Sequence, residues 1–196
     1  MKPVTIGAAT VTRIEESYEP NFSAAAFFPD WRPDIADTHR GWLVPDHYDP
    51  ASGFLKLSVH SWLIKLAGRT ILIDTCVGNH KERPARPKWH RMETPYLQRL
   101  ADAGVNPDEI DMVMCTHLHV DHVGWNTRLD DGRWVPTFPK ARYIFSKADY
   151  DYYAALDRDA EKGPANHGSF RDSVLPIVDA GLAEIVSGAH ALDEHL

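Results

Sequence analysis

The segment His-Leu-His-Val-Asp-His at residues 117–122 gathers four possible metal ligands within six residues. Side chains two residues apart point the same way in an extended chain, so we expect His117, His119 and Asp121 to share one face. His122 points away from that face unless the chain turns there. Imidazole and carboxylate together suit zinc, iron, manganese or cobalt better than calcium. The pattern therefore favours a transition-metal site over a solvated histidine-rich turn.

A short, mostly apolar strand is expected directly before this segment, at residues 110–115. Such strands are usually buried on both faces and parallel to a neighbour. The possible ligands would then leave the carboxyl end of a buried strand, where α/β folds place their sites. Gly124 follows the segment and would permit a turn.

The rest of the chain alternates predicted strands and helices, the pattern of a layered α/β fold. Thr94 and Ser146 are suited to cap two helices, and Gly104 to end the first of them. A third helical stretch at 170–178 should be kinked or split by Pro176. A hairpin turn is expected around residues 67–69 and another around 130–132. Strands are expected at residues 4–14, 54–63, 70–74, 110–115, 142–145 and 183–186.

Residues 15–50 show little periodicity and are rich in proline and aromatic side chains. A loop of this length is usually functional or disordered, and the aromatic content argues against disorder. We expect a lid over an apolar substrate or a homodimer contact. The alternative is that these aromatics form a small satellite core beneath a loop.

The amino-acid composition limits the kinds of molecule that the protein is expected to bind. The net charge of −7 and the lack of a long basic run argue against nucleic acid and anionic membranes. The sequence has neither the apolar core of a signal peptide at its start nor a stretch that could span a bilayer, so we expect a cytoplasmic protein that acts on a small molecule. Cys76 and Cys115 are too few for a disulfide framework, and we expect both to be small buried thiols.

Residues 116–126, Thr-His-Leu-His-Val-Asp-His-Val-Gly-Trp-Asn, match the H-x-H-x-D-H signature of the metallo-β-lactamase superfamily. The resemblance includes residues 71–80, 141–153 and 172–181, and runs from about residue 54 to the end of the chain. Within the superfamily the chain is similar to the lactonase-like branch, which includes acyl-homoserine lactonases, pyridoxolactonase and the methyl-parathion-hydrolase type. The resemblance implies an α/β fold, the αββα sandwich. Residues 1–196 would form one such domain, incomplete at its carboxyl end, with the N-terminal half and the linking region.

The resemblance also implies a dinuclear metal centre. His117 and His119 would hold the first ion, and Asp121 and His122 the second. Asp74 would brace the metal loop without binding metal. The two divalent ions are expected to be zinc, with iron, manganese or cobalt as alternatives. A hydroxide generated between them would attack a lactone, ester or related centre, with Asp121 orienting it and handling a proton.

The chain offers fewer ligands than two ions require. Each ion needs about four ligands, and the segment supplies two for each. His190 is included among the candidate ligands, with His167 and His195 as further possibilities, although a loop or surface position suits all three better. Two alternatives to a hydrolase therefore stay open: an inactive truncated fragment with a half-built site, and a single-iron dioxygenase on the same fold.

Overall fold

The structure is a computed structural model that describes residues 2–159, 161, 163–188 and 190–192. The chain divides into two compact units, one made of Met1–Glu16 and His60–Leu196 and the other of Ser17–Val59. Two long strands, β2 (Ala9–Ser23) and β4 (Phe54–Leu66), contribute residues to both units. The segment with the possible metal ligands lies in the first unit.

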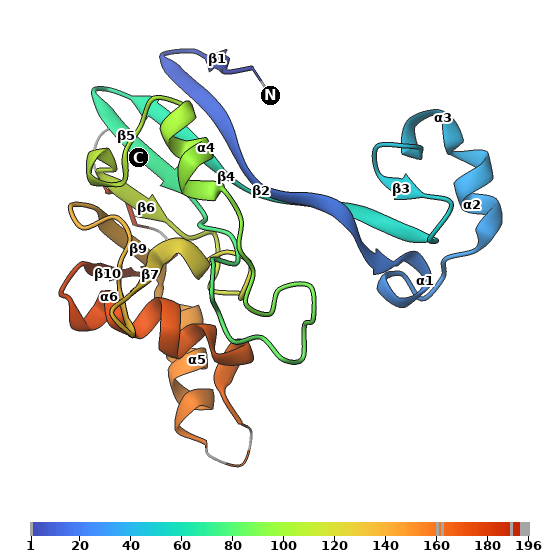
Figure 1. The fold of residues 1–196 in the computed structure, drawn as a ribbon. Helices are drawn as coiled ribbons and strands as arrows, with labels where there is room; N and C mark the ends of the chain where they lie inside the picture. Colours follow the sequence, from blue (N-terminus) through green and yellow to red (C-terminus); the bar gives the residue numbers. More distant parts are fainter. Residues whose placement is uncertain (1, 160, 162, 189, 193–196) are drawn as a thin grey trace. The chain divides into compact units, whose positions relative to one another are not determined.

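Four neighbouring strands of the first unit run parallel to one another (Figure 1). They follow the order β5, β6, β9 and β10, and β4 pairs antiparallel with β5. At the far edge of the sheet, β1 (Val4–Ile6) pairs antiparallel with β2. The bounds of the parallel strands are β5 (Arg69–Ile73), β6 (Met112–Met114), β9 (Arg142–Ser146) and β10 (Ala183–Val186). The predicted parallel strand before the metal-ligand segment is thus confirmed as β6.

Both faces of this parallel region carry apolar side chains. On one face Ile71, Met112 and Ile144 form a buried cluster. On the other, Leu72, Val113 and Tyr143 are fully buried. Burial on both faces explains why β6 is an apolar run without alternation.

The helices of the first unit are α4 (Tyr96–Asp102), α5 (Lys147–Arg158) and α6 (Leu175–Asp179). Ser146 caps α5 as predicted, because its hydroxyl accepts the N–H of Asp149. Thr94 does not cap α4, which begins after Pro95. The Thr94 N–H and hydroxyl donate to Asn79 instead, at 2.8 and 3.1 Å, so a loop contact replaces the cap.

Turns and short helices connect these elements. Gly104 ends α4 in the left-handed region, with a φ of 77°. The expected helical stretch near residue 176 is split as predicted, because Pro176 lies in the first turn of α6 after the π-helical turn η5. The remaining elements are η1 (Pro107–Glu109), η2 (Gly124–Asn126), the hairpin β7 (Thr127–Asp130) and β8 (Arg133–Pro136), η4 (Ala165–Gly168) and η5 (Phe170–Val174).

Residues 15–50 are more regular than the expected loop. Strand β2 continues to Ser23, and its strand pattern is hidden in the sequence because the charged Glu16 occupies a buried position two residues after Ile14. The elements that follow β2 in the second unit are α1 (Ala24–Phe27), α2 (Pro33–Thr38), α3 (Arg40–Leu43) and β3 (Tyr48–Asp49). Phe27, Phe28 and Trp42 are exposed. Within the described residues, no helix has the length and apolar character needed to cross a bilayer.

Candidate metal centre

The segment at residues 117–122 leaves β6 as a tight turn and not as an extended chain. The N–H of His122 donates to the carbonyl oxygen of His119 at 3.0 Å. The ring centroid of His117 lies 4.5 Å from that of His119 and 3.9 Å from that of His122. The turn therefore gathers three imidazoles, including the one that an extended chain would point away.

Asp121 lies beside this group, with its Oδ2 atom 3.7 Å from Nε2 of His122. Three imidazoles and a carboxylate are the donors that zinc and similar ions prefer, so the donor chemistry fits such ions. Within the described ranges, no three His, Cys, Asp or Glu side chains are arranged so as to hold one ion.

Asp74 connects this turn to the end of β5. Its carboxylate accepts the N–H of Thr116 at 2.7 Å and the Thr116 hydroxyl, and it lies 2.9 Å from Nδ1 of His122. Asp74 has a φ of 58°, an uncommon value for a residue other than glycine. The carboxylate of Asp74, directly after β5, thus holds Thr116 at one end of the ligand segment and His122 at the other.

Two histidines of the group have shifted pKa values. Burial lowers the pKa of His117, and the neighbouring His122 and His119 act in the same direction. Burial also disfavours the charged form of His122, but the hydrogen bond to Asp74 and the charges of Asp121 and Asp74 outweigh it and raise its pKa. The neutral form favoured at His117 is the form that binds metal.

A buried carboxylate connects the loop after β5 to the residues that follow the ligand segment. Glu16 accepts hydrogen bonds from Val77 N, Gly78 N and Trp125 Nε1 at 2.8, 3.0 and 2.7 Å. Burial raises the pKa of Glu16 to about 7, although these donors favour the charged form. Sequence analysis did not identify this group, because a charged residue within a strand is usually exposed.

Gly124 has a packing role that differs from the expected one. A Cβ atom on Gly124 would lie 1.8 Å from the carbonyl oxygen of Val77. Its N–H donates to the carbonyl oxygen of Cys76 at 2.7 Å. Gly124 is therefore required for the close crossing of two loops, and the turn itself is made earlier, between His119 and His122.

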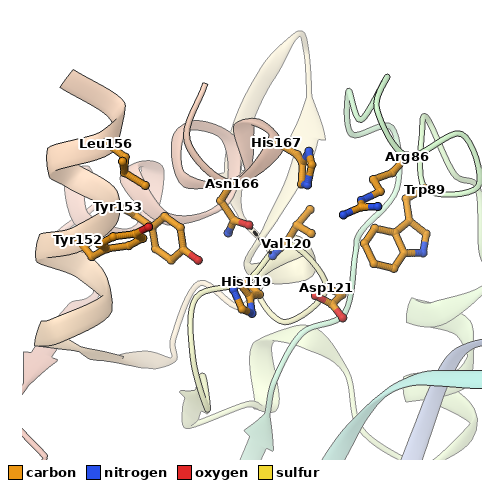
Figure 2. A pocket seen from close by; sticks show the side chains of 10 residues that line it. All are labelled: Arg86, Trp89, His119, Val120, Asp121, Tyr152, Tyr153, Leu156, Asn166 and His167. Carbon is orange, nitrogen blue, oxygen red and sulfur yellow. Dashed lines mark hydrogen bonds between the residues drawn. The ribbon is translucent and has the colours of Figure 1, made fainter. Parts of the chain in front are cut away.

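A cavity of about 330 Å³ opens beside His119, Val120 and Asp121 (Figure 2). The ring of Tyr153 lies 6.3 Å from that of His119, which connects α5 to the ligand group. The other lining residues are Arg86, Trp89, Tyr152, Leu156, Asn166 and His167. Figure 2 shows the tyrosines and Leu156 on the side of α5, across from Arg86 and Trp89. Sequence reasoning missed Arg86 and Trp89, which lie in a loop, and Asn166, which lies in η4; none of them belongs to a recognisable motif.

The three histidines considered as further ligands do not lie together. His167 lines the same cavity as His119 and Asp121. His190 hydrogen-bonds to Glu184 at 3.2 Å and lines a different cavity with Cys115. His195 lies outside the described residues. Cys76 and Cys115 are free, buried thiols, as predicted.

Comparison with known proteins places this geometry in a family. The sequence profile described as "Metallo-beta-lactamase superfamily" matches residues 55–192. A curated relative, N-acyl homoserine lactonase AiiB of Agrobacterium fabrum, is 29% identical over 136 residues, which cover 61% of this chain and 45% of the relative. The AiiB protein of Rhizobium rhizogenes matches to the same extent. The chain therefore spans about half the length of these relatives.

Solved structures share the fold at low sequence identity. The hydrolase AbOPH of the beta lactamase superfamily has a TM-score of 0.72 and 18% identity, covering 97% of this chain and 62% of that one. AidC, a dizinc quorum-quenching lactonase, has a TM-score of 0.66 and 19% identity, with the same coverage. The predicted α/β class and partial αββα sandwich are confirmed, as is the similarity to lactonases. Because the profile match covers more than half of its residues, this chain belongs to the metallo-β-lactamase superfamily.

Proposed function

We propose that this chain carries the metal site of a metal-dependent hydrolase that acts on a lactone or a related ester. The observation that carries the proposal is the gathering of three imidazoles and Asp121 beside a cavity. The relatives support it, since two matching proteins are named N-acyl homoserine lactonases. One structural neighbour, with a TM-score of 0.55, is an N-acyl homoserine lactone hydrolase with its product bound at the catalytic metal centre.

Each candidate ligand is assigned to one of two metal ions. His117 and His119 would hold one divalent ion, and Asp121 and His122 the other. Such ions act as Lewis acids and lower the pKa of bound water. Asp121, beside the cavity, would accept a proton during the attack on the substrate. Asp74 would keep His122 oriented through the hydrogen bond to Nδ1.

The cavity supports a substrate with an apolar part. Its volume of about 330 Å³ lies within the range of small-molecule sites, about 300–1,000 Å³. Trp89, Tyr153 and Leu156 provide surface for an acyl chain or an aromatic group. Because His119 and Asp121 line the same space, a carbonyl group attached to that apolar part would reach them.

Metal analysis combined with hydrolysis assays tests the proposal. Purified, dialysed protein is expected to retain zinc, and about two ions per chain would mean that donors beyond residues 117–122 complete both sites. It should hydrolyse an acyl-homoserine lactone or a phenyl ester, and His119→Ala should reduce both metal content and rate, the rate by about 100-fold. Gln98→Ala, which changes an exposed amide on α4, serves as the control.

The outcomes separate the alternatives. Wild-type protein with neither metal nor hydrolytic activity would refute the hydrolase and indicate a non-catalytic fragment. Bound iron with oxygen consumption would indicate a dioxygenase instead. Hydrolysis that survives in His119→Ala would place the chemistry elsewhere on the chain.

A further inference from the structure

The side chain of Asn166 contacts the ligand segment on both sides of His119. Its Oδ1 atom accepts the N–H of Val120 at 3.2 Å, the bond drawn in Figure 2. Its Nδ2 group donates to the carbonyl oxygen of Leu118. We propose that Asn166 is a positioning residue that fixes the backbone around His119 and so aims its imidazole. The consequence for metal binding rests on the proposed function.

The backbone around His119 needs side-chain partners because it has left the sheet. Strand β6 ends at Met114, and in the part of the chain that the structure describes no strand pairs with residues 118–120. Leu118 and Val120 are 1% and 5% exposed, so water has little access to them. Buried peptide groups without partners are costly. Asp149 of α5 accepts the Leu118 N–H at 3.1 Å, and Asn166 binds the Leu118 C=O and the Val120 N–H.

Asparagine suits this position for two independent reasons. Its carboxamide carries both a donor and an acceptor, so it can bind a C=O and an N–H at once, whereas a carboxylate can only accept. Asn166 also has φ and ψ of 51° and 48°, in the left-handed region that asparagine tolerates better than most residues. His167 follows in the same region with a φ of 58°. Two successive non-glycine residues in this conformation require external support.

That support comes from a buried ion pair. Arg83 donates to the carbonyl oxygen of His167 at 3.3 Å and binds Asp172 through two hydrogen bonds of 2.7 and 2.9 Å. The hydroxyl of Ser169 donates to the carbonyl oxygen of Asn166 at 2.9 Å. The strained turn is therefore held by residues outside the ligand segment. It can present the carboxamide to the segment whether or not an ion is bound.

The variant Asn166→Gly separates the carboxamide from the backbone conformation. Glycine adopts the left-handed region freely, so the turn is retained while both hydrogen bonds are lost. Amide hydrogen exchange at Val120, measured on metal-free protein, should become at least ~10-fold faster. Zinc affinity, measured by competition with a chelator, should fall by about 10-fold. The variant should still fold, because glycine keeps the turn, although the two peptide groups left without partners will lower its melting temperature.

Two further variants make the test specific. Asp131→Gly places glycine at another left-handed position, with a φ of 46°, in the exposed β7–β8 turn, and should change neither measurement. Asn166→Asp keeps an acceptor for the Val120 N–H. Exchange of the Val120 amide in this variant should therefore stay closer to the wild-type rate than in Asn166→Gly. Unchanged exchange at Val120 in folded Asn166→Gly would overturn the proposal. If the wild-type protein binds no zinc, the proposed hydrolase is refuted. If Asn166→Gly still exchanges the Val120 amide faster than the wild type in that case, the positioning role of Asn166 is supported.

Discussion

Asp74 Oδ2 and His122 Nδ1 lie 2.9 Å apart and link the end of β5 to the last residue of the ligand segment. This hydrogen bond places a proton on Nδ1 and leaves Nε2 on the side of Asp121, 3.7 Å away. The Asp74 carboxylate therefore selects the tautomer in which Nε2 can bind an ion. The same carboxylate holds Thr116, so the tautomer and the loop position are set together.

Asp74→Asn tests this relationship. The amide keeps the shape of the side chain and tolerates the left-handed backbone, but it lacks the negative charge. Because Asp74 helps to raise the pKa of His122, the variant should have a lower His122 pKa in an NMR titration of metal-free protein. Metal affinity should fall by about 10–100-fold. An unchanged His122 titration would show that Asp74 does not act on the imidazole.

The ligand segment could be predicted from sequence because its information is local. Six consecutive residues carry the four donors, and the strand before them is an apolar run. The turn between His119 and His122 could not be predicted, since it depends on contacts with Asp74 and Thr75 more than forty residues earlier. Local spacing therefore identified the donors, but it left open whether the chain turns so that His122 joins the other two imidazoles.

Glu16 and Asn166 illustrate what sequence patterns omit. Glu16 breaks the alternation of β2, and its partners Val77 and Trp125 are distant in sequence. Asn166 contacts Val120 across 46 residues, in a turn whose sequence suggests only a loop. Such polar contacts leave no periodic signal, because a single buried hydrogen-bonding residue has no repeating partners. The proposed lid or dimer role of residues 15–50 and the cytoplasmic location stay predictions.

Gly124→Ala should strongly destabilise the protein. The new Cβ would meet the backbone of Val77 at 1.8 Å, and neither loop can move without breaking the hydrogen bond from Gly124 N to Cys76 O. We expect a loss of about 4 kcal/mol or more in the free energy of unfolding, measured with urea. Gly41→Ala is the matched control, because nothing lies within 4 Å of its Cβ position in α3. It should be neutral or stabilise by up to about 1 kcal/mol. Similar stabilities of the two variants would contradict the close crossing.

Asp172→Ala should also destabilise the protein, for an electrostatic reason. The side chains of Lys81 and Arg83 are both 0% exposed, and Asp172 lies 3.7 and 2.7 Å from their side-chain nitrogens. Because burial lowers the pKa of Lys81 to about 7, Arg83 carries the permanent positive charge of this group. Removing the carboxylate leaves buried positive charge without compensation, at a cost of about 3–5 kcal/mol. The exposed pair Lys147–Asp151 provides the control, and Asp151→Ala should cost less than about 1 kcal/mol. Urea denaturation of both variants at neutral pH measures the difference.

The buried carboxyl group of Glu16 should make the stability of the protein depend on pH. Burial raises its pKa in the folded protein from the ordinary value of 4.5 to about 7. Between these values the folded state binds more protons than the unfolded state, so stability falls as pH rises. The shift corresponds to about 3 kcal/mol lost between pH 4.5 and 7. Glu16→Gln cannot titrate, so the stability of wild type relative to this variant should decline over that window. Parallel curves for the two proteins would mean that Glu16 stays ionised throughout, held by Val77, Gly78 and Trp125.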